Sequence, residues 1–156
     1  RVDFGQEADL DAEHLPRWFP PTEAWHESGI MKEFPLVFMS ERNRNRYHSQ
    51  DYDNTWLNEL EPDPILRMNP VDAEARGIVE GDWIMVRNTR GHAVARARIS
   101  AGIRPGTVIY PKGWQMHQFK SGCWGSLHNS QFDPVGVNNS YFDVVCEVGK
   151  WDGGES

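Results

Sequence analysis

The sequence predicts a mainly β fold, a compact β-barrel with short helices and long loops. Several apolar runs have the length of short strands, turn residues separate them, and only two patterns fit a helix, both short. A chain of 156 residues is long enough to bury a substantial core. We expect an extended arm or connector over residues 1–33, the barrel over residues 34–150 and a tail over residues 151–156.

The first elements are an extended arm, a buried strand, a polar loop and a short helix. Prolines favour extended structure in the arm, with at most a short helix after Thr22. Residues 34–39 are apolar and fit a buried strand, whereas residues 40–52 are polar and fit a loop. Asn54 is a good N-cap for a short helix that the following prolines end. That helix is expected to carry an apolar side formed by Trp56, Leu57 and Leu60.

The middle of the chain predicts a strand, a capped helix and a β-hairpin. Residues 66–68 form a short strand, Asn69 and Pro70 suit a helix start, and Gly77 suits its end. The hairpin strands are expected at the two apolar runs that flank a turn, namely residues 83–87 and 93–99. Trp83 is expected in the core.

The last third predicts two strands separated by long loops. A turn at residues 103–106 leads into a strand over residues 107–110. Residues 111–142 are rich in Gly, Asn and Trp and are expected to be loops, in which Trp114 and Trp124 are candidates for exposure. A final strand is expected over residues 143–148.

The composition excludes some function classes. The net charge is −7, of which −5 falls in residues 1–33, so we expect no general nucleic-acid binding. No run of about 18 apolar residues occurs, and we expect no membrane span or direct membrane contact. Cys123 and Cys146 are expected to be buried small side chains, and no zinc-ligand spacing is present. The chain reads as a fragment of a longer protein, so its compartment cannot be inferred from the sequence.

One polar loop, residues 40–50, carries Arg42, Arg44 and Arg46 two residues apart. In an extended loop these arginines would point one way, and Asn43, Asn45 and Tyr47 would point the other. Guanidinium groups bind phosphate, and Ser, Asn and Gln read purine or ribose edges. The loop therefore predicts a nucleotide site, with a solvated basic loop as the alternative.

Two further segments are candidates for binding. Residues 126–134 and 138–141 are rich in Asn and Ser, which either bind a ligand or serve turn geometry. In residues 112–117, Gly113 permits a close backbone approach. His117 of that segment either faces a ligand or binds a loop carbonyl.

Residues 69–91 resemble the C-terminal, dinucleotide-binding domain of the molybdopterin oxidoreductases of the dimethyl sulfoxide reductase family. The resemblance extends over residues 18–150 and implies a six-stranded double-psi β-barrel of the aspartate-decarboxylase-like type. It implies no catalytic residue and no metal ligand in this chain. The residues that it and the loop compositions assign to cofactor binding are Ser40, Glu41, Arg42, Arg44, Arg46, Tyr47, His48, Ser49, Gln50, Trp114, His117, Asn129, Asn138 and Asn139.

The resemblance also implies a role in a larger enzyme. The domain would grip a molybdopterin guanine dinucleotide of a molybdenum or tungsten bis(molybdopterin guanine dinucleotide) centre and cover the active-site funnel. Metal ligands and any iron–sulfur cluster would lie in other domains of the same catalytic subunit, and an iron–sulfur electron-transfer subunit is a further expected partner. Within the family, residues 46–50 and 56–60 are most similar to the branches that reduce polysulfide, thiosulfate and aromatic substrates. The expected compartment is the periplasm or cytoplasm of a bacterium or archaeon.

Two other functions compete with this interpretation. A self-processing barrel enzyme of the aspartate-decarboxylase type needs a Gly-Ser cleavage site, and only Gly125 followed by Ser126 offers one. A stand-alone module that binds proteins or carbohydrates would expose aromatic side chains outside the two polar loops. The cofactor-binding interpretation instead predicts that residues 40–50 and 126–141 lie on one side of the barrel.

Overall fold

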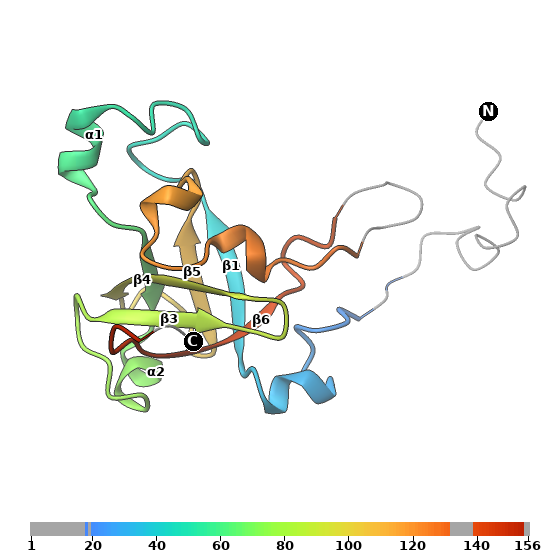
Figure 1. Ribbon diagram of the computed structural model, residues 1–156. Coiled ribbons are helices and arrows are strands. Elements are labelled where there is room, and N and C mark those ends of the chain that lie inside the picture. The colour runs from blue at the N-terminus through green and yellow to red at the C-terminus, as the bar shows by residue number, and fades with distance from the viewer. Residues whose placement is uncertain (1–17, 19, 132–138, 155–156) are drawn as a thin grey trace, which may run out of the picture.

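Six strands close into a barrel in the computed structural model, which describes residue 18, residues 20–131 and residues 139–154 (Figure 1). The strands are β1 (Leu36–Glu41), β2 (Ile65–Met68), β3 (Trp83–Arg87), β4 (His92–Ile99), β5 (Thr107–Pro111) and β6 (Val145–Lys150). Their order around the barrel is β1-β5-β2-β4-β3-β6. The pairs β1/β5 and β2/β4 are parallel and the other pairs are antiparallel. The predicted six-stranded double-psi barrel is confirmed.

The barrel interior is filled by alternate residues of the strands. In β3, Ile84 and Val86 are fully buried, and Phe38 of β1 and Val108 of β5 meet them in the same core. Because neighbouring residues of a strand point to opposite faces, Trp83 lies on the outside of the barrel. The Arg96 guanidinium and the Lys120 ammonium each lie over the Trp83 ring, 4.0 and 4.1 Å from its centroid. The prediction that Trp83 is a core residue is therefore wrong.

The two helices begin where their capping residues predict. The Asn54 side chain accepts hydrogen bonds from the first turn of α1 (Thr55–Leu60), and Asn69 does the same for α2 (Pro70–Glu74). Gly77 has φ +63°, and the Ile78 N–H donates to the Ala73 carbonyl at 2.9 Å, which ends α2 as expected. Among the described residues, no helix is long and apolar enough to cross a membrane.

The described residues also form the 3₁₀ helices η2 (Gly29–Lys32), η3 (Met116–Gln118) and η4 (Trp124–Leu127). In the described part of the arm the helical turn is η2 and does not directly follow Thr22, and the backbone N–H groups of residues 22–24 bind the Asp143 carboxylate. The Trp124 side chain in η4 is buried, which corrects its assignment to an exposed loop position. The Trp124 ring packs against Tyr110 and Phe119, with centroids 5.0 and 5.2 Å apart.

Two strand boundaries differ from the prediction. Strand β1 continues through Ser40 and Glu41, because both residues pair with the last residues of β5. The final strand begins at Val145 and not at Asp143, whose carboxylate and carbonyl groups are occupied by contacts outside the sheet. Ser40 and Glu41 therefore stand on a rigid element that leads directly into the polar loop.

Helix α1 does not bury the apolar side that its sequence predicts. Trp56 is 77% exposed and Leu60 is 68% exposed, whereas Leu57 is half-buried. The helix is short and projects beside the barrel, and no described helix or strand packs over that side (Figure 1). Cys146 is buried as predicted, and Cys123 is half-buried with its thiol free.

Candidate functional site

The polar loops gather at one end of the barrel. Parallel pairing aligns Glu41 of β1 with Pro111 of β5, so the chain leaves both strands at this end. The segment before β6 reaches the same place, because the Phe38 N–H donates to the Val144 carbonyl at 2.8 Å. We call this region the loop end; it consists of residues 42–53, 112–131 and 139–143 (Figure 1).

Two of these segments approach each other closely at Gly113. A Cβ atom at this position would lie 2.1 Å from the His48 carbonyl oxygen, and Gly113 has φ +107°. His48 itself has φ +53°, a left-handed conformation that costs free energy for a residue other than glycine. The Arg46 guanidinium covers the Trp114 ring, with 4.2 Å between its Cζ and the ring centroid. The two loops therefore form one continuous surface.

The path of the first loop differs from an extended chain. The Asn43 Oδ1 atom accepts from the Asn45 N–H at 2.7 Å, which turns the chain, and its Nδ2 donates to Glu61 at 2.8 Å. As a result Asn43 and Arg46 are buried, whereas Arg42 is exposed. The prediction that the three arginines point the same way is wrong, because the turn breaks the alternation of an extended loop.

Arg46 keeps hydrogen-bond donors without partners. Its side chain is 6% exposed, and its Nη2 atom donates to the Asn58 Oδ1 at 2.8 Å and to the Glu61 carbonyl at 3.3 Å. The Nε and Nη1 atoms are buried and have no hydrogen-bond partner within the described part of the chain. Burial lowers the pKa of Arg46, and the Glu61 carboxylate opposes this effect. Buried donors of this kind are costly unless a ligand or water satisfies them.

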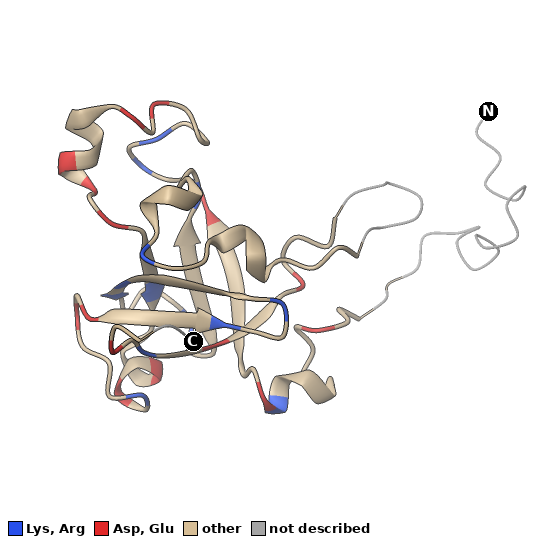
Figure 2. Ribbon diagram, viewed as in Figure 1, with Lys and Arg blue, Asp and Glu red and all other residues tan. Residues whose placement is uncertain are grey.

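A small cavity beside Arg46 is surrounded mainly by cationic and polar groups. It has a volume of about 20 Å³, enough for one water-sized group. Figure 2 shows Lys and Arg positions in the loop that follows β1. The residues that line the cavity are Arg42, Asn43, Arg46, Tyr47, His48 and Lys112. Guanidinium and ammonium groups in this arrangement suit an oxygen atom of an anion such as phosphate.

A column of rings lies beneath the other half of the loop end. The Tyr110 hydroxyl and the His128 Nε2 atom are 2.6 Å apart, and Tyr110 stacks on Phe38 with centroids 4.6 Å apart. Burial raises the pKa of Tyr110 and lowers the pKa of His128, to which the Arg90 charge contributes. Both side chains are therefore neutral, and one hydrogen bond joins the Tyr110 hydroxyl to the His128 Nε2 atom. The half-exposed ring of Tyr141 lies over His128, with centroids 4.3 Å apart.

Asn129 shapes its own loop. Its Nδ2 atom donates to the Asp143 carbonyl at 2.6 Å, and its Oδ1 atom accepts from the Gln131 N–H at 3.2 Å. Asn139 is exposed nearby, and Asn138 lies outside the described residues. Asn129 thus fixes the chain on both sides of the segment that contains these candidates.

Apart from Asn138, the predicted residues divide into three groups. The loop end, with Ser40 at the adjoining end of β1, brings together Arg42, Arg46, Tyr47, His48, Trp114, Asn129 and Asn139. Three others, Ser49, Gln50 and His117, are exposed at its margin, where His117 packs edge-on against Tyr52. Glu41 instead pairs with Arg67 at 2.9 Å, and Arg44 lines a groove on another side of the barrel.

Some site residues were not selected from the sequence. Lys112 lines the small cavity, and Tyr110 and His128 form the ring column. Tyr110 belongs to a strand whose register was not predictable, so no local pattern marks it. The position of His128 directly before Asn129 was the only local signal.

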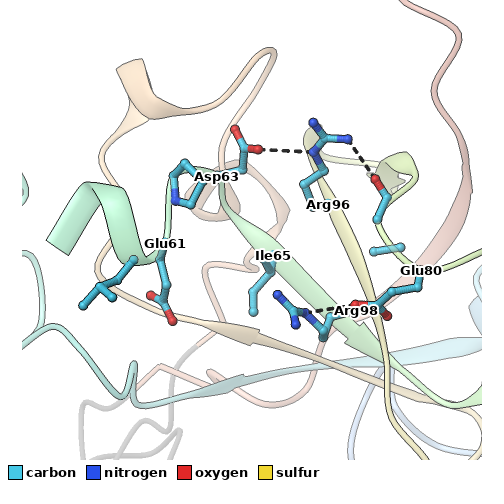
Figure 3. A pocket seen from close by; sticks show the side chains of 10 residues that line it. Glu61, Asp63, Ile65, Glu80, Arg96 and Arg98 are labelled. Carbon is cyan, nitrogen blue, oxygen red and sulfur yellow. Dashed lines mark hydrogen bonds and ion pairs between the residues drawn. The ribbon is translucent and has the colours of Figure 1, made fainter. Parts of the chain in front are cut away.

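A second concavity lies away from the loop end, between the end of α1 and strand β4. It has a volume of about 250 Å³, and Figure 3 shows Ile65 between two ion pairs at its rim. Arg96 pairs with Asp63 and Arg98 pairs with Glu80, both at 3.2 Å. Because these carboxylates neutralise the arginines, the groove is a weaker site for an anion than the loop end.

Comparisons with known proteins agree with this geometry. Residues 36–145 match the family described as "Molydopterin dinucleotide binding domain". The chain is 33% identical over 176 residues to the pyrogallol hydroxytransferase large subunit of Pelobacter acidigallici, covering 96% of this chain and 20% of the relative. It is 36% identical over 104 residues to a dimethyl sulfoxide/trimethylamine N-oxide reductase of Cereibacter sphaeroides, covering 64% of this chain and 12% of the relative.

A solved structure shares the fold. The structure of acetylene hydratase from Pelobacter acetylenicus superposes with a TM-score of 0.72 at 23% identity, and the match covers 92% of this chain and 22% of that one. The chain therefore spans about a fifth or less of the length of these relatives.

Proposed function

This chain belongs to the molybdopterin dinucleotide-binding domains of the dimethyl sulfoxide reductase family, and we propose that its loop end holds the dinucleotide of that cofactor. The observation that carries the proposal is Arg46, whose two unpartnered N–H-bearing atoms are buried beside a small cationic cavity. A phosphate oxygen satisfies such donors and favours the charged guanidinium. The residues present therefore fit the anionic part of the cofactor.

The proposed roles follow from where the side chains lie. Arg46, Arg42 and Lys112 hold the pyrophosphate, while Ser40 and the Asn139 segment offer hydrogen bonds to base, ribose or pterin edges. Asn129 acts by fixing its loop, because its amide is already bonded to the protein. When bound, the cofactor's metal supplies redox chemistry, and the residues of this chain bind and orient the group.

For the whole protein, we propose a molybdenum or tungsten bis(molybdopterin guanine dinucleotide) oxidoreductase. Its metal ligand and any iron–sulfur cluster would lie in other domains of the catalytic subunit, with an iron–sulfur electron-transfer subunit as a further partner. For the substrate we propose an aromatic compound, with polysulfide and thiosulfate as the alternatives, because the chain is similar to a protein named pyrogallol hydroxytransferase. The periplasm or cytoplasm of a bacterium or archaeon is the proposed compartment.

The test is a two-dimensional amide NMR titration of the ¹⁵N-labelled chain with guanosine diphosphate. We expect shifts at residues 42–50 and 112–117, and smaller shifts with guanosine, which lacks the phosphates. Arg46→Lys should weaken binding, because Lys is a point charge and lacks the planar donor fork. Arg98→Lys, on another side of the barrel, is the matched control. Shifts that cluster around Arg98, or equal affinities for the two variants, would refute the proposed site.

A second candidate function has one observation in its favour. Exposed aromatic side chains outside the polar loops are what a stand-alone binding module predicts, and Trp56 is such a residue. A face that contacts neighbouring domains of a larger subunit predicts the same exposure. Trp56→Ser separates the two candidates. The change abolishes ligand-induced amide shifts only if the ligand binds to a platform at α1.

A further inference from the structure

The described start of the chain is anchored to the loop end by one carboxylate. Asp143 accepts hydrogen bonds from three consecutive backbone N–H groups, those of Thr22 at 2.6 Å, Glu23 at 2.9 Å and Ala24 at 2.7 Å. Carboxylates that accept several backbone N–H bonds form strong, charge-assisted contacts. These bonds connect positions about 120 residues apart in the sequence.

An ion pair between the exposed Arg90 and the buried Glu23 makes a second connection. The Glu23 side chain is 8% exposed, and its two oxygens accept from Arg90 at 2.5 and 3.0 Å. The Arg90 Nε atom also donates to the Leu127 carbonyl at 3.0 Å. The Glu23 backbone carbonyl accepts a hydrogen bond from the Ser28 hydroxyl at 2.7 Å. The bidentate geometry fixes the relative position of both segments, and the loss of Arg90 would leave the buried Glu23 carboxylate without its charged partner.

Asp143 and the turn that carries Arg90 also hold both sides of the Asn129 loop. Asn129 donates to the Asp143 carbonyl, and Asn88, in the turn that carries Arg90, donates to the carbonyls of Leu127 at 2.8 Å and Val145 at 3.2 Å. Figure 1 shows the segment before η2 beside the segment that leads into β6. The positions of residues 127–131 and 139–145 are thus tied to that of residues 22–24.

We propose that residues 22–24 form a latch that sets the geometry of the Asn129 loop, the described residues 127–131 and 139–143, with Glu23, Arg90 and Asp143 as positioning residues. The proposal rests on the proposed function only in assigning a ligand to that loop. With the latch closed, the loop is ordered around Asn129. When the bonds to residues 22–24 break, Asp143 is no longer held in place. Its carbonyl then no longer fixes Asn129, and the loop binds the dinucleotide less tightly.

The test measures amide hydrogen exchange and guanosine diphosphate affinity in three variants, Glu23→Gln, Arg90→Lys and Asp143→Asn. The reporters are the N–H groups of Gln131 and Ser140, which bond to Asn129 Oδ1 and to the Gln131 carbonyl. Neither contacts Glu23 or Arg90 directly. We expect exchange at these two amides to accelerate about tenfold, with affinity falling about three- to tenfold. Glu80→Gln, which breaks an exposed ion pair with Arg98, is the matched control and should change neither.

Each outcome decides one of the two proposals. Faster exchange confined to residues 22–24, with Gln131 and Ser140 unchanged in all three variants, would overturn the latch and leave only an anchored arm. If the unaltered chain shows no shifts with guanosine diphosphate, the proposed ligand site fails, while the exchange of Gln131 and Ser140 still decides the latch. Protected β3 amides in each variant show that the barrel remains folded.

Discussion

Replacing Gly113 by Ala tests the close approach on which the loop end is built. The added Cβ would lie 2.1 Å from the His48 carbonyl oxygen and 3.1 Å from its carbon. Both are backbone atoms, so a side-chain rotation cannot relieve the clash and the two loops must separate. The positive φ of +107° adds strain that only glycine avoids.

The expected loss of stability has two parts. Placing a non-glycine residue in a sparsely populated backbone conformation costs about 1–3 kcal/mol. Separating the loops removes the contact between Arg46 and Trp114, and such cation–π contacts contribute about 0.5–2 kcal/mol. We therefore expect a loss of about 2–4 kcal/mol and a fall in Tm of about 5–15 °C.

Thermal and urea unfolding followed by circular dichroism measure this loss. Gly77→Ala is the matched control, because Gly77 has φ +63° but no atom within 4 Å of the added Cβ. The free energy of unfolding of that variant should fall by about 1 kcal/mol, from backbone strain alone. Guanosine diphosphate binding should weaken in Gly113→Ala and not in Gly77→Ala. Equal destabilisation of the two variants would refute the argument that the close approach at His48 matters.

Three further predictions concern the core, a helix cap and a buried histidine. Leu127→Ala should lower the free energy of unfolding by about 2–5 kcal/mol in urea titrations, because Leu127 is fully buried. Asn69→Ala should cost about 1–2 kcal/mol in the same assay, since it removes the cap of α2 and the bond to the Ile103 carbonyl; a loss near zero would contradict the capping role. The folded-state pKa of His128 is lowered from 6.5, so the unfolded chain binds more protons and stability falls as pH drops below that value. His128→Gln should therefore flatten the pH dependence of unfolding on the acid side, whereas a matched change at the exposed His26 should not.

Local chemistry accounts for the parts of the fold that were predictable. Asn54 and Asn69 cap their helices, and Gly77 ends α2, because these effects depend on residues a few positions apart. The β3–β4 hairpin has the same basis, since the turn brings adjacent strands together. The barrel topology, with β1 beside β5 and β2 beside β4, came from family resemblance, because periodicity carries no information about which distant strands pair.

The sequence by itself determined the elements, the polar character of the loops and the family to which the domain belongs. Only the tertiary structure decided which polar groups are free for a ligand. Arg46 and Arg42 look alike in sequence, yet a turn at Asn43 buries the first with unpartnered donors and leaves the second exposed. Likewise the Asn129 side chain donates to the Asp143 carbonyl, and Trp56 is 77% exposed on the side of α1 that its sequence marks as apolar. Such outcomes depend on contacts between segments far apart in the chain, and a local pattern of residue types cannot encode them.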